Sequence, residues 1–166
     1  MSNVYKRNRK HSQYAKFLIT KSISKEIHMM YRAKDHKYFP KEFYHYYKSL
    51  NQNNDKIVKN LAAVYSERVR NTGNAATLES FDISITLLNE AIDISEGCIQ
   101  LLQDYYAERQ LYIPKLSKRL VKVSRRIQNL IINYILLTDE LKPYLKTIKK
   151  KKKEHINKSQ RDGDRD

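Results

Sequence analysis

Residues that could perform chemistry are few in this chain, and they are not assembled into a catalytic set. Glu42 and His45 have the spacing that places two metal ligands on one face of a helix. A di-iron centre in a helical bundle requires a second such pair and two further carboxylates, and no second Glu-x-x-His pair exists here. Cys98 is the single cysteine, and the glycines are too isolated to form a phosphate-binding loop. We therefore expect a protein that is not an enzyme and has no catalytic residue, metal or cofactor.

The charge of the chain indicates a binding function instead. Its 166 residues include 33 lysines and arginines against 18 aspartates and glutamates, a formal net charge of +15. A field of this size favours polyanionic partners, either nucleic acid or an anionic membrane surface. The general richness in Lys, Asn, Ile and Tyr is typical of an AT-rich genome and would raise the lysine content without any function. The cluster of Arg119, Arg125 and Arg126 is not explained by such a bias.

Acids and bases occupy adjacent blocks. Residues 71–108 contain no lysine or arginine, and residues 109–138 contain no aspartate or glutamate. The acids of the first block are Glu79, Asp82, Glu90, Asp93, Glu96, Asp104 and Glu108. The bases of the second are Arg109, Lys115, Lys118, Arg119, Lys122, Arg125 and Arg126. Both blocks also have a helical apolar period, so their charges are expected to lie on defined helix faces.

Hydrophobic periodicity predicts four helices with few breaks between them. The first begins near Ser12, the second follows Pro40, the turn at 71–74 separates the second from the third, and the fourth follows Pro114. The expected core positions of the second helix are Phe43, Tyr47, Leu50, Ile57, Leu61 and Val64. Those of the third are Leu78, Phe81, Ile85, Leu88, Ile92, Ser95, Ile99, Leu102 and Tyr106. Those of the fourth are Leu116, Leu120, Val123, Ile127, Leu130, Tyr134, Leu137 and Leu141.

These helices predict an all-α fold, an antiparallel up-down-up-down four-helix bundle in a single domain. The bundle is expected to span residues 12–145. Residues 1–11 are expected to form a basic arm. Residues 146–166, which follow Pro143, are expected to form a polybasic and disordered tail.

The bases of the fourth helix recur every three or four positions and so form one stripe about 16 Å long. This basic stripe consists of Lys115, Lys118, Arg119, Lys122, Arg125 and Arg126. Stacked like charges destabilise a helix, so the stripe needs a partner. Phosphates, the acidic face of the third helix in the same chain, or that face in a neighbouring chain would each serve. The last contact is head-to-tail and would close into a cyclic homo-oligomer. Further bases for nucleic acid are Arg7, Arg9 and Lys10 in the arm and Lys149, Lys150 and Lys151 in the tail.

Tyrosines offer a second kind of contact with nucleic acid. The side chains with this potential are Tyr44, Tyr46, Tyr47, Tyr105, Tyr106 and Tyr112. Unpaired bases stack well on such rings. Aromatic residues of helical bundles also fill the core or an interface, and both alternatives remain open from the sequence.

Several short motifs resemble a known family. They are Tyr38-Phe39-Pro40-Lys41-Glu42 after the first helix, Asn60-Leu61-Ala62-Ala63 near the end of the second, and Tyr112-Ile113-Pro114 before a fourth helix with Val123, Ile127, Leu130, Ile131 and Tyr134. Residues 13–134 thereby resemble the four-helix bundles of the 23S rRNA intervening-sequence protein family and the related accessory variability determinant of diversity-generating retroelements. The resemblance implies a basic, pentameric, ring-forming bundle that binds nucleic acid and assists a reverse transcriptase in mutagenic cDNA synthesis. It assigns the nucleic-acid role to Lys118, Arg119, Lys122, Arg125 and Arg126.

The sequence therefore predicts a non-enzymatic nucleic-acid-binding accessory protein that contacts the phosphates of RNA or DNA. The alternative is a helical protein-interaction or assembly module whose basic stripe docks on acidic protein surfaces. A membrane-surface role for Lys149–Lys153 lacks an apolar anchor, and the apolar run Leu130–Leu137 is too short to span a bilayer. With one cysteine and no apolar stretch at the N-terminus, the expected location is the cytoplasm.

Overall fold

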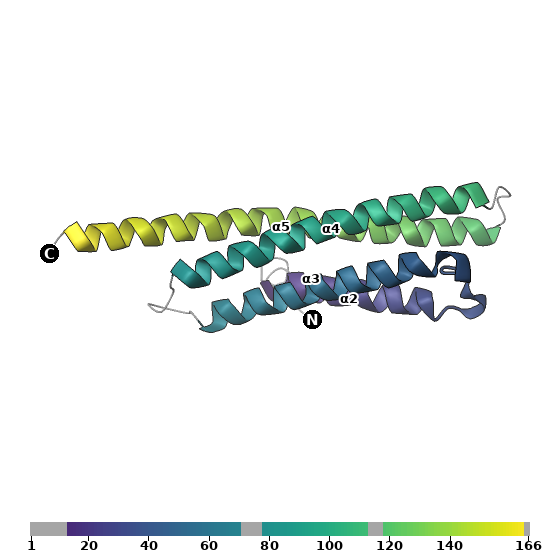
Figure 1. Cartoon of the computed structure of the whole chain (residues 1–166), viewed down its shortest axis with the longest axis horizontal. Helices are drawn as coiled ribbons and strands as arrows, with labels where there is room; N and C mark the ends of the chain where they lie inside the picture. The colour runs from purple at the N-terminus through teal and green to yellow at the C-terminus, as the bar shows by residue number, and fades with distance from the viewer. Residues whose placement is uncertain (1–12, 71–77, 113–117, 165–166) are drawn as a thin grey trace, which may run out of the picture.

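The computed structural model describes residues 13–70, 78–112 and 118–164, and these residues form helices and turns but no strand (Figure 1). The four long helices are α2 (Gln13–Tyr31), α3 (Tyr44–Arg70), α4 (Leu78–Tyr112) and α5 (Lys118–Asp164). Two short 3-10 turns, η1 (Lys34–His36) and η2 (Lys41–Phe43), lie between α2 and α3. The four helices pack against one another, which confirms the prediction of an all-helical fold.

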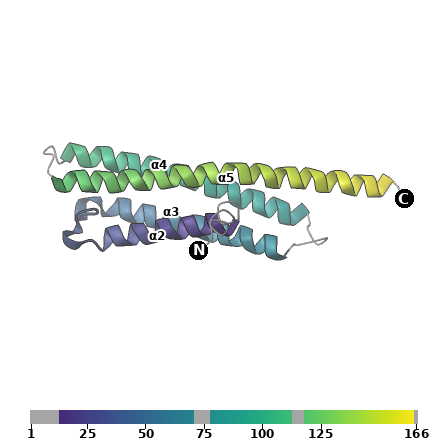
Figure 2. The ribbon, with the colours of Figure 1, turned by 180° about the vertical axis from the view of Figure 1, so that it is seen from behind.

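Each helix packs along the next in sequence, and α2 also packs against α5 (Figures 1 and 2). Lys152 of α5 pairs with Asp82 early in α4, whereas Lys142 pairs with Glu96 further along α4. Residues later in α5 therefore contact residues earlier in α4, so these two helices are antiparallel. At 47 residues, α5 is the longest helix, and its C-terminal part extends beyond the other three (Figure 2).

The predicted core of α3 and α5 is confirmed. All six expected positions from Phe43 to Val64 are buried, and so are the six described positions from Val123 to Leu141. Leu116 lies outside the described residues, and no side chain is described for Leu120. Apolar residues that recur at steps of three and four form one stripe along a helix. In α3 and α5 this is the single apolar stripe, and it is the part that is buried.

The buried seam of α4 differs from the predicted one. Four predicted positions, Leu88, Ile92, Ser95 and Leu102, are buried as expected. The other buried positions of α4 are Ser80, Ser84, Ala91, Cys98, Tyr105 and Arg109. Phe81, Ile85, Ile99 and Tyr106 of the predicted seam are only half-buried, and Leu78 is exposed. Like α3 and α5, α4 packs against two helices, but it has two adjacent rows of apolar and small side chains, and the row with Ser84, Ala91 and Cys98 is the more deeply buried one. The larger apolar side chains beside that row cover its flanks.

The disordered tail predicted for residues 146–166 is wrong as far as Asp164, because α5 continues through Pro143. Leu145 and Ile148 extend the apolar stripe and are buried. Beyond them, Lys152 pairs with Asp82 of α4, and the His155 ring lies 5.7 Å from that of Phe81. Pro143 removes one backbone hydrogen bond from the helix, and this packing against α4 offsets the loss. Residues 165–166 and the predicted basic arm at 1–11 lie outside the described residues.

Candidate nucleic-acid interface on the fourth helix

The predicted binding residues divide into those whose side chains are described and those whose side chains are not. Arg7, Arg9, Lys10 and Lys115 lie outside the described residues. Lys118, Arg119 and Lys122 belong to the first turns of α5, but their side chains are not described. Arg125, Lys149, Lys150 and Lys151 are exposed on α5, whereas Arg126 is partly buried.

Arg126 makes contacts within the chain. Its guanidinium pairs with Glu26 of α2, donates a hydrogen bond of 3.1 Å to the Tyr38 hydroxyl, and lies 5.0 Å from the centre of the Tyr38 ring. The hydrogen bond to Glu26 is the largest cause of a raised pKa at Arg126. This arginine therefore joins α5 to α2 and to the segment that follows α2. A phosphate would have to compete with Glu26 for it.

Sequence reasoning did not identify the role of Arg109, the last base of α4. Its side chain is buried, and it donates hydrogen bonds to the Tyr38 carbonyl at 2.8 Å, to the Tyr105 hydroxyl at 2.5 Å and to the Lys37 carbonyl. The guanidinium thus satisfies two backbone carbonyls of the connection between α2 and α3. Only the position of Arg109 four residues after Tyr105 is visible in the sequence, while the carbonyls come from residues far away in the chain.

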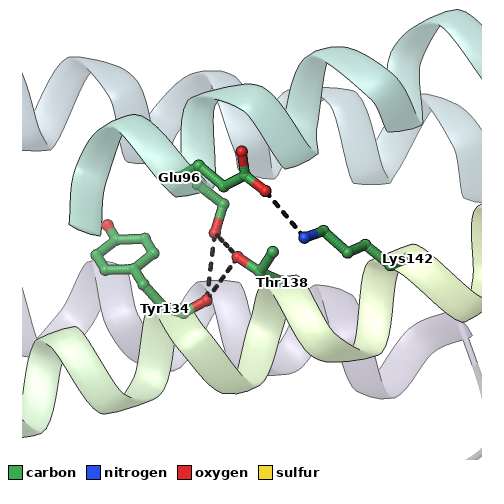
Figure 3. Close-up of polar contacts among 5 residues, drawn as sticks. Glu96, Tyr134, Thr138 and Lys142 are labelled. Carbon is green, nitrogen blue, oxygen red and sulfur yellow. Dashed lines mark hydrogen bonds and ion pairs between the residues drawn. The ribbon is translucent and has the colours of Figure 1, made fainter. Parts of the chain in front are cut away.

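The continuation of α5 creates a basic surface that extends past the predicted tail residues. Lys142, Lys146, Lys149, Lys150 and Lys153 are exposed and follow one another at steps of four, three, one and three, so they share a side of the helix. We call this set the lysine face. Lys142 pairs with Glu96 at 3.1 Å (Figure 3), and the other four make no ion pair with the described residues. The apolar residues Leu145 and Ile148 were the signal in the sequence for this continuation.

Acids of α4 contact α3 and the later half of α5. Glu90 lies 3.6 Å from Lys56, and Tyr46 donates a hydrogen bond to Glu108 that is the main cause raising the Tyr46 pKa to about 12. Among the described residues, no acid of α4 pairs with Arg125 or Arg126. Exposed pairs of the Glu90 type contribute roughly 0 to 1 kcal/mol each. The expected neutralisation of the basic stripe by the third helix of the same chain is therefore not among the described contacts.

Buried polar side chains form a hydrogen-bonded layer in the interior of the bundle. Ser95 Oγ lies 2.8 Å from Thr138 Oγ1, and both hydroxyls contact the Tyr134 carbonyl (Figure 3). The Tyr134 hydroxyl donates to Asn54 Oδ1 at 2.8 Å, and the Asn54 amide is 3.5 Å from the Thr20 carbonyl. Burial raises the pKa of Tyr134 well above its usual value, so the hydroxyl stays a donor. The layer links all four helices and satisfies its own hydrogen bonds.

Groups that could support catalysis are not assembled in the described part of the chain. Burial raises the pKa of the Cys98 thiol to about 12, which leaves almost no thiolate at neutral pH. Glu42 and His45 are both exposed. Within the described residues no group of three or more His, Cys, Asp or Glu side chains could hold a metal ion. None of the described helices has both the length and the apolar character of a membrane-spanning segment.

Comparison with protein-family models, curated proteins and solved structures gives no match for this chain. In the described residues, four long helices form a bundle, and α5, the longest of them, carries exposed lysines.

Proposed function

We propose that this chain is a non-enzymatic nucleic-acid-binding accessory protein that contacts phosphates through α5. The observation that carries the proposal is the lysine face, in which Lys146, Lys149, Lys150 and Lys153 are exposed and make no ion pair with the described residues. Like charges three and four residues apart disfavour a helix, and phosphates on this side would remove the repulsion. Each phosphate contact would also release a bound counterion from the nucleic acid.

Binding of this kind depends on the charge and shape of the nucleic acid. Lysines along a helix surface contact the backbone of a nucleic acid, and contacts to phosphate carry no sequence information. The Arg125 side chain, exposed near the start of α5, would extend the same contact. We expect affinities that are similar for unrelated sequences and fall steeply with salt.

The test replaces Lys146, Lys149, Lys150 and Lys153 together by glutamine in the full chain. Fluorescence anisotropy with labelled RNA and DNA is measured between about 50 and 200 mM salt, a range over which several phosphate contacts change affinity strongly. For duplex DNA, the slope of log affinity against log salt should lose about 0.9 for each lysine that contacts a phosphate.

A matched control removes the same charge elsewhere. Lys21, Lys25, Lys56 and Lys59 are exposed on α2 and α3, and their replacement by glutamine should leave most of the slope in place. Equal losses in both variants would show that only the net charge matters. A wild-type chain that binds neither RNA nor DNA at low salt would contradict the proposed function.

The proposal extends to partners. An up-down-up-down bundle related to the intervening-sequence proteins and the retroelement accessory determinant would act in the cytoplasm as a cyclic homo-oligomer that presents template to a reverse transcriptase. Support for this part comes from the short motifs around Tyr38–Glu42, Asn60–Ala63 and Tyr112–Pro114. Copurification of a reverse transcriptase encoded beside the gene, lost on mutation of α5, is the expected result.

A second candidate function is a protein-interaction or assembly module. It is favoured by the exposed acids Glu79, Asp93 and Asp104 on α4, a helix whose residues carry no lysine or arginine before Arg109. An acidic face and a basic face on adjacent helices suit docking between proteins. This candidate predicts assembly that depends on salt and does not respond to RNA or DNA.

A further inference from the structure

Tyr44 is a partly exposed aromatic residue at the junction of two helices. It begins α3, directly after η2, and 46% of its surface is exposed. Its ring centre lies 6.2 Å from that of Tyr31 and 5.9 Å from that of Tyr47, tilted by 50° and 43°. Tyr31 and Tyr47 are themselves stacked at 4.0 Å with an interplanar angle of 9°. The Tyr44 ring is thus held by two fixed rings while part of it remains accessible to solvent.

The surroundings of this tyrosine cluster are mainly basic. Arg32 follows Tyr31 directly, is exposed, and lies close enough to Tyr47 to lower its pKa, although burial raises that pKa overall. Lys48 is exposed one turn after Tyr44, so it lies on the same side of α3. The exposed acids nearby in sequence are Glu42 and Asp55.

Position in the bundle connects this cluster with the proposed interface. The end of α2, the start of α3, the end of α4 and the start of α5 lie at the same end of the molecule (Figure 1). Two arginines make the link, since Arg126 of α5 and Arg109 of α4 both bind Tyr38 between α2 and α3. Lys146 of the lysine face lies about 30 Å further along α5 than Arg126, at 1.5 Å per residue, so a single strand that contacts both the lysine face and Tyr44 would run along α5 toward the end of the bundle at which Tyr44 is exposed.

We propose that Tyr44 is a stacking platform for an unpaired base of a single-stranded nucleic acid, with Arg32 and Lys48 binding the adjacent phosphates. The inference rests on the proposed function and names its substrate class. A ring held by neighbours loses little freedom on binding, and every base has a face that stacks on it. Bases of a duplex are already stacked, so a duplex would have to be unstacked to use this platform. Phosphates beside the stacked base carry the charge that Arg32 and Lys48 complement.

The experiment compares Tyr44→Ala with Tyr44→Phe in the full chain. The probes are fluorescein-labelled oligo(dT) and oligo(U) of about 15 nucleotides and a DNA duplex of the same length, a size sufficient for several stacked bases. Tyr44→Ala should weaken binding of a single strand about tenfold. Duplex affinity should be unchanged, and Tyr44→Phe should bind like the wild type because the ring remains. The two single-stranded probes show whether RNA, DNA or both use the platform, and a loss with either supports the inference.

Controls separate stacking from damage to the fold. Tyr65→Ala removes another exposed tyrosine of α3 and should bind like the wild type. An abasic strand of the same length should bind the wild type as weakly as oligo(dT) binds Tyr44→Ala, and it should not respond to that variant. If Tyr44→Ala loses helicity by circular dichroism, the pair Arg32→Gln and Lys48→Gln provides a second test with the tyrosine cluster intact. That pair should also weaken single-strand binding more than duplex binding.

Two negative results have different meanings. If Tyr44→Ala leaves both single strands bound as before, or weakens the duplex equally, the stacking platform is refuted while phosphate binding by α5 stands. If the wild-type chain binds none of the probes at low salt, the proposed function itself fails.

Discussion

Arg109 and Arg126 hold the connection between α2 and α3 against the rest of the bundle. Each binds Tyr38, Arg109 through the backbone carbonyl and Arg126 through the hydroxyl. The connection contains the one described non-glycine residue with positive φ, His36 at 49°, and it has few hydrogen bonds of its own. Arg109 supplies donors for the Lys37 and Tyr38 carbonyls, whereas Arg126 donates to the Tyr38 hydroxyl and to Glu26. The two arginines therefore tie this connection, which leads into Tyr44 at the start of α3, to α4 and α5.

Replacing Arg109 by methionine should lower the free energy of unfolding by about 2 to 4 kcal/mol, because buried carbonyls lose charge-assisted hydrogen bonds. Arg109→Lys should recover only part of this loss, since an ammonium group cannot reproduce the planar fork that reaches two carbonyls and a hydroxyl. Urea denaturation followed by circular dichroism measures the change.

The control for Arg109 is Arg125→Met, because Arg125 is exposed on α5. That variant should stay within about 0.5 kcal/mol of the wild type. A similar loss in both variants would mean that arginine content, rather than the buried hydrogen bonds of Arg109, determines the stability.

The length of α5 depends on a single apolar stripe that continues along the helix. Residues 146–164 are rich in lysine and contain few apolar side chains, yet Leu145 and Ile148 are buried between the ion pairs that Lys142 and Lys152 make with α4. Burial of each such side chain contributes roughly 1.5 to 3 kcal/mol relative to exposure. This burial stabilises the helical conformation of the segment that carries the lysine face.

Ile148→Ser should therefore release the C-terminal part of α5. The expected result is faster amide hydrogen exchange across residues 149–164, with little change in the rest of the bundle. Lys149→Ser is the matched control, because it removes an exposed side chain at the next position. Unchanged exchange in Ile148→Ser would show that contacts beyond Ile148, such as those of Lys152 and His155 with α4, are sufficient.

How far the sequence predicts the core of each helix depends on whether the helix has one apolar stripe or two. The helices and the cores of α3 and α5 follow from periodicity, since each of these helices has one apolar stripe. The core seam of α4 follows only in part. Leu88, Ile92, Ser95 and Leu102 are buried as predicted, but the neighbouring positions Ser84, Ala91 and Cys98 are buried in place of Phe81, Ile85 and Ile99. At the candidate site, the exposure of Lys149–Lys151 is visible in the sequence. The pairing of Arg126 with Glu26 is not, because it joins residues 100 positions apart.

On the scale of the whole molecule, charge and exposed apolar surface lie on neighbouring helices. The acids Asp93 and Asp104 are exposed on α4. On α5, Ile132, Ile135 and Leu136 are 52%, 42% and 54% exposed, and they lie between Arg125 and Lys142 in sequence. Arg125 precedes these apolar side chains on α5, and the exposed Asp139 and Lys142 follow them, so the surface combines apolar and charged groups of the kind found at protein interfaces. A second copy of the chain offers the exposed acids of α4, in the head-to-tail sense that closes rings.

This geometry predicts that two different variants will complement each other. Asp93→Arg with Asp104→Arg disables the α4 surface, and Ile132→Asp with Leu136→Asp disables the α5 surface; each variant alone should be monomeric by light scattering. Mixed together, they retain one intact surface of each kind and should form a complex of two chains that cannot close into a ring. High salt should weaken that complex, because opposite charges contribute to its interface. A wild-type chain that is monomeric at low salt, or a mixture that remains monomeric, would show that the α4 and α5 surfaces do not bind each other, and the exposed isoleucines would then need a different partner.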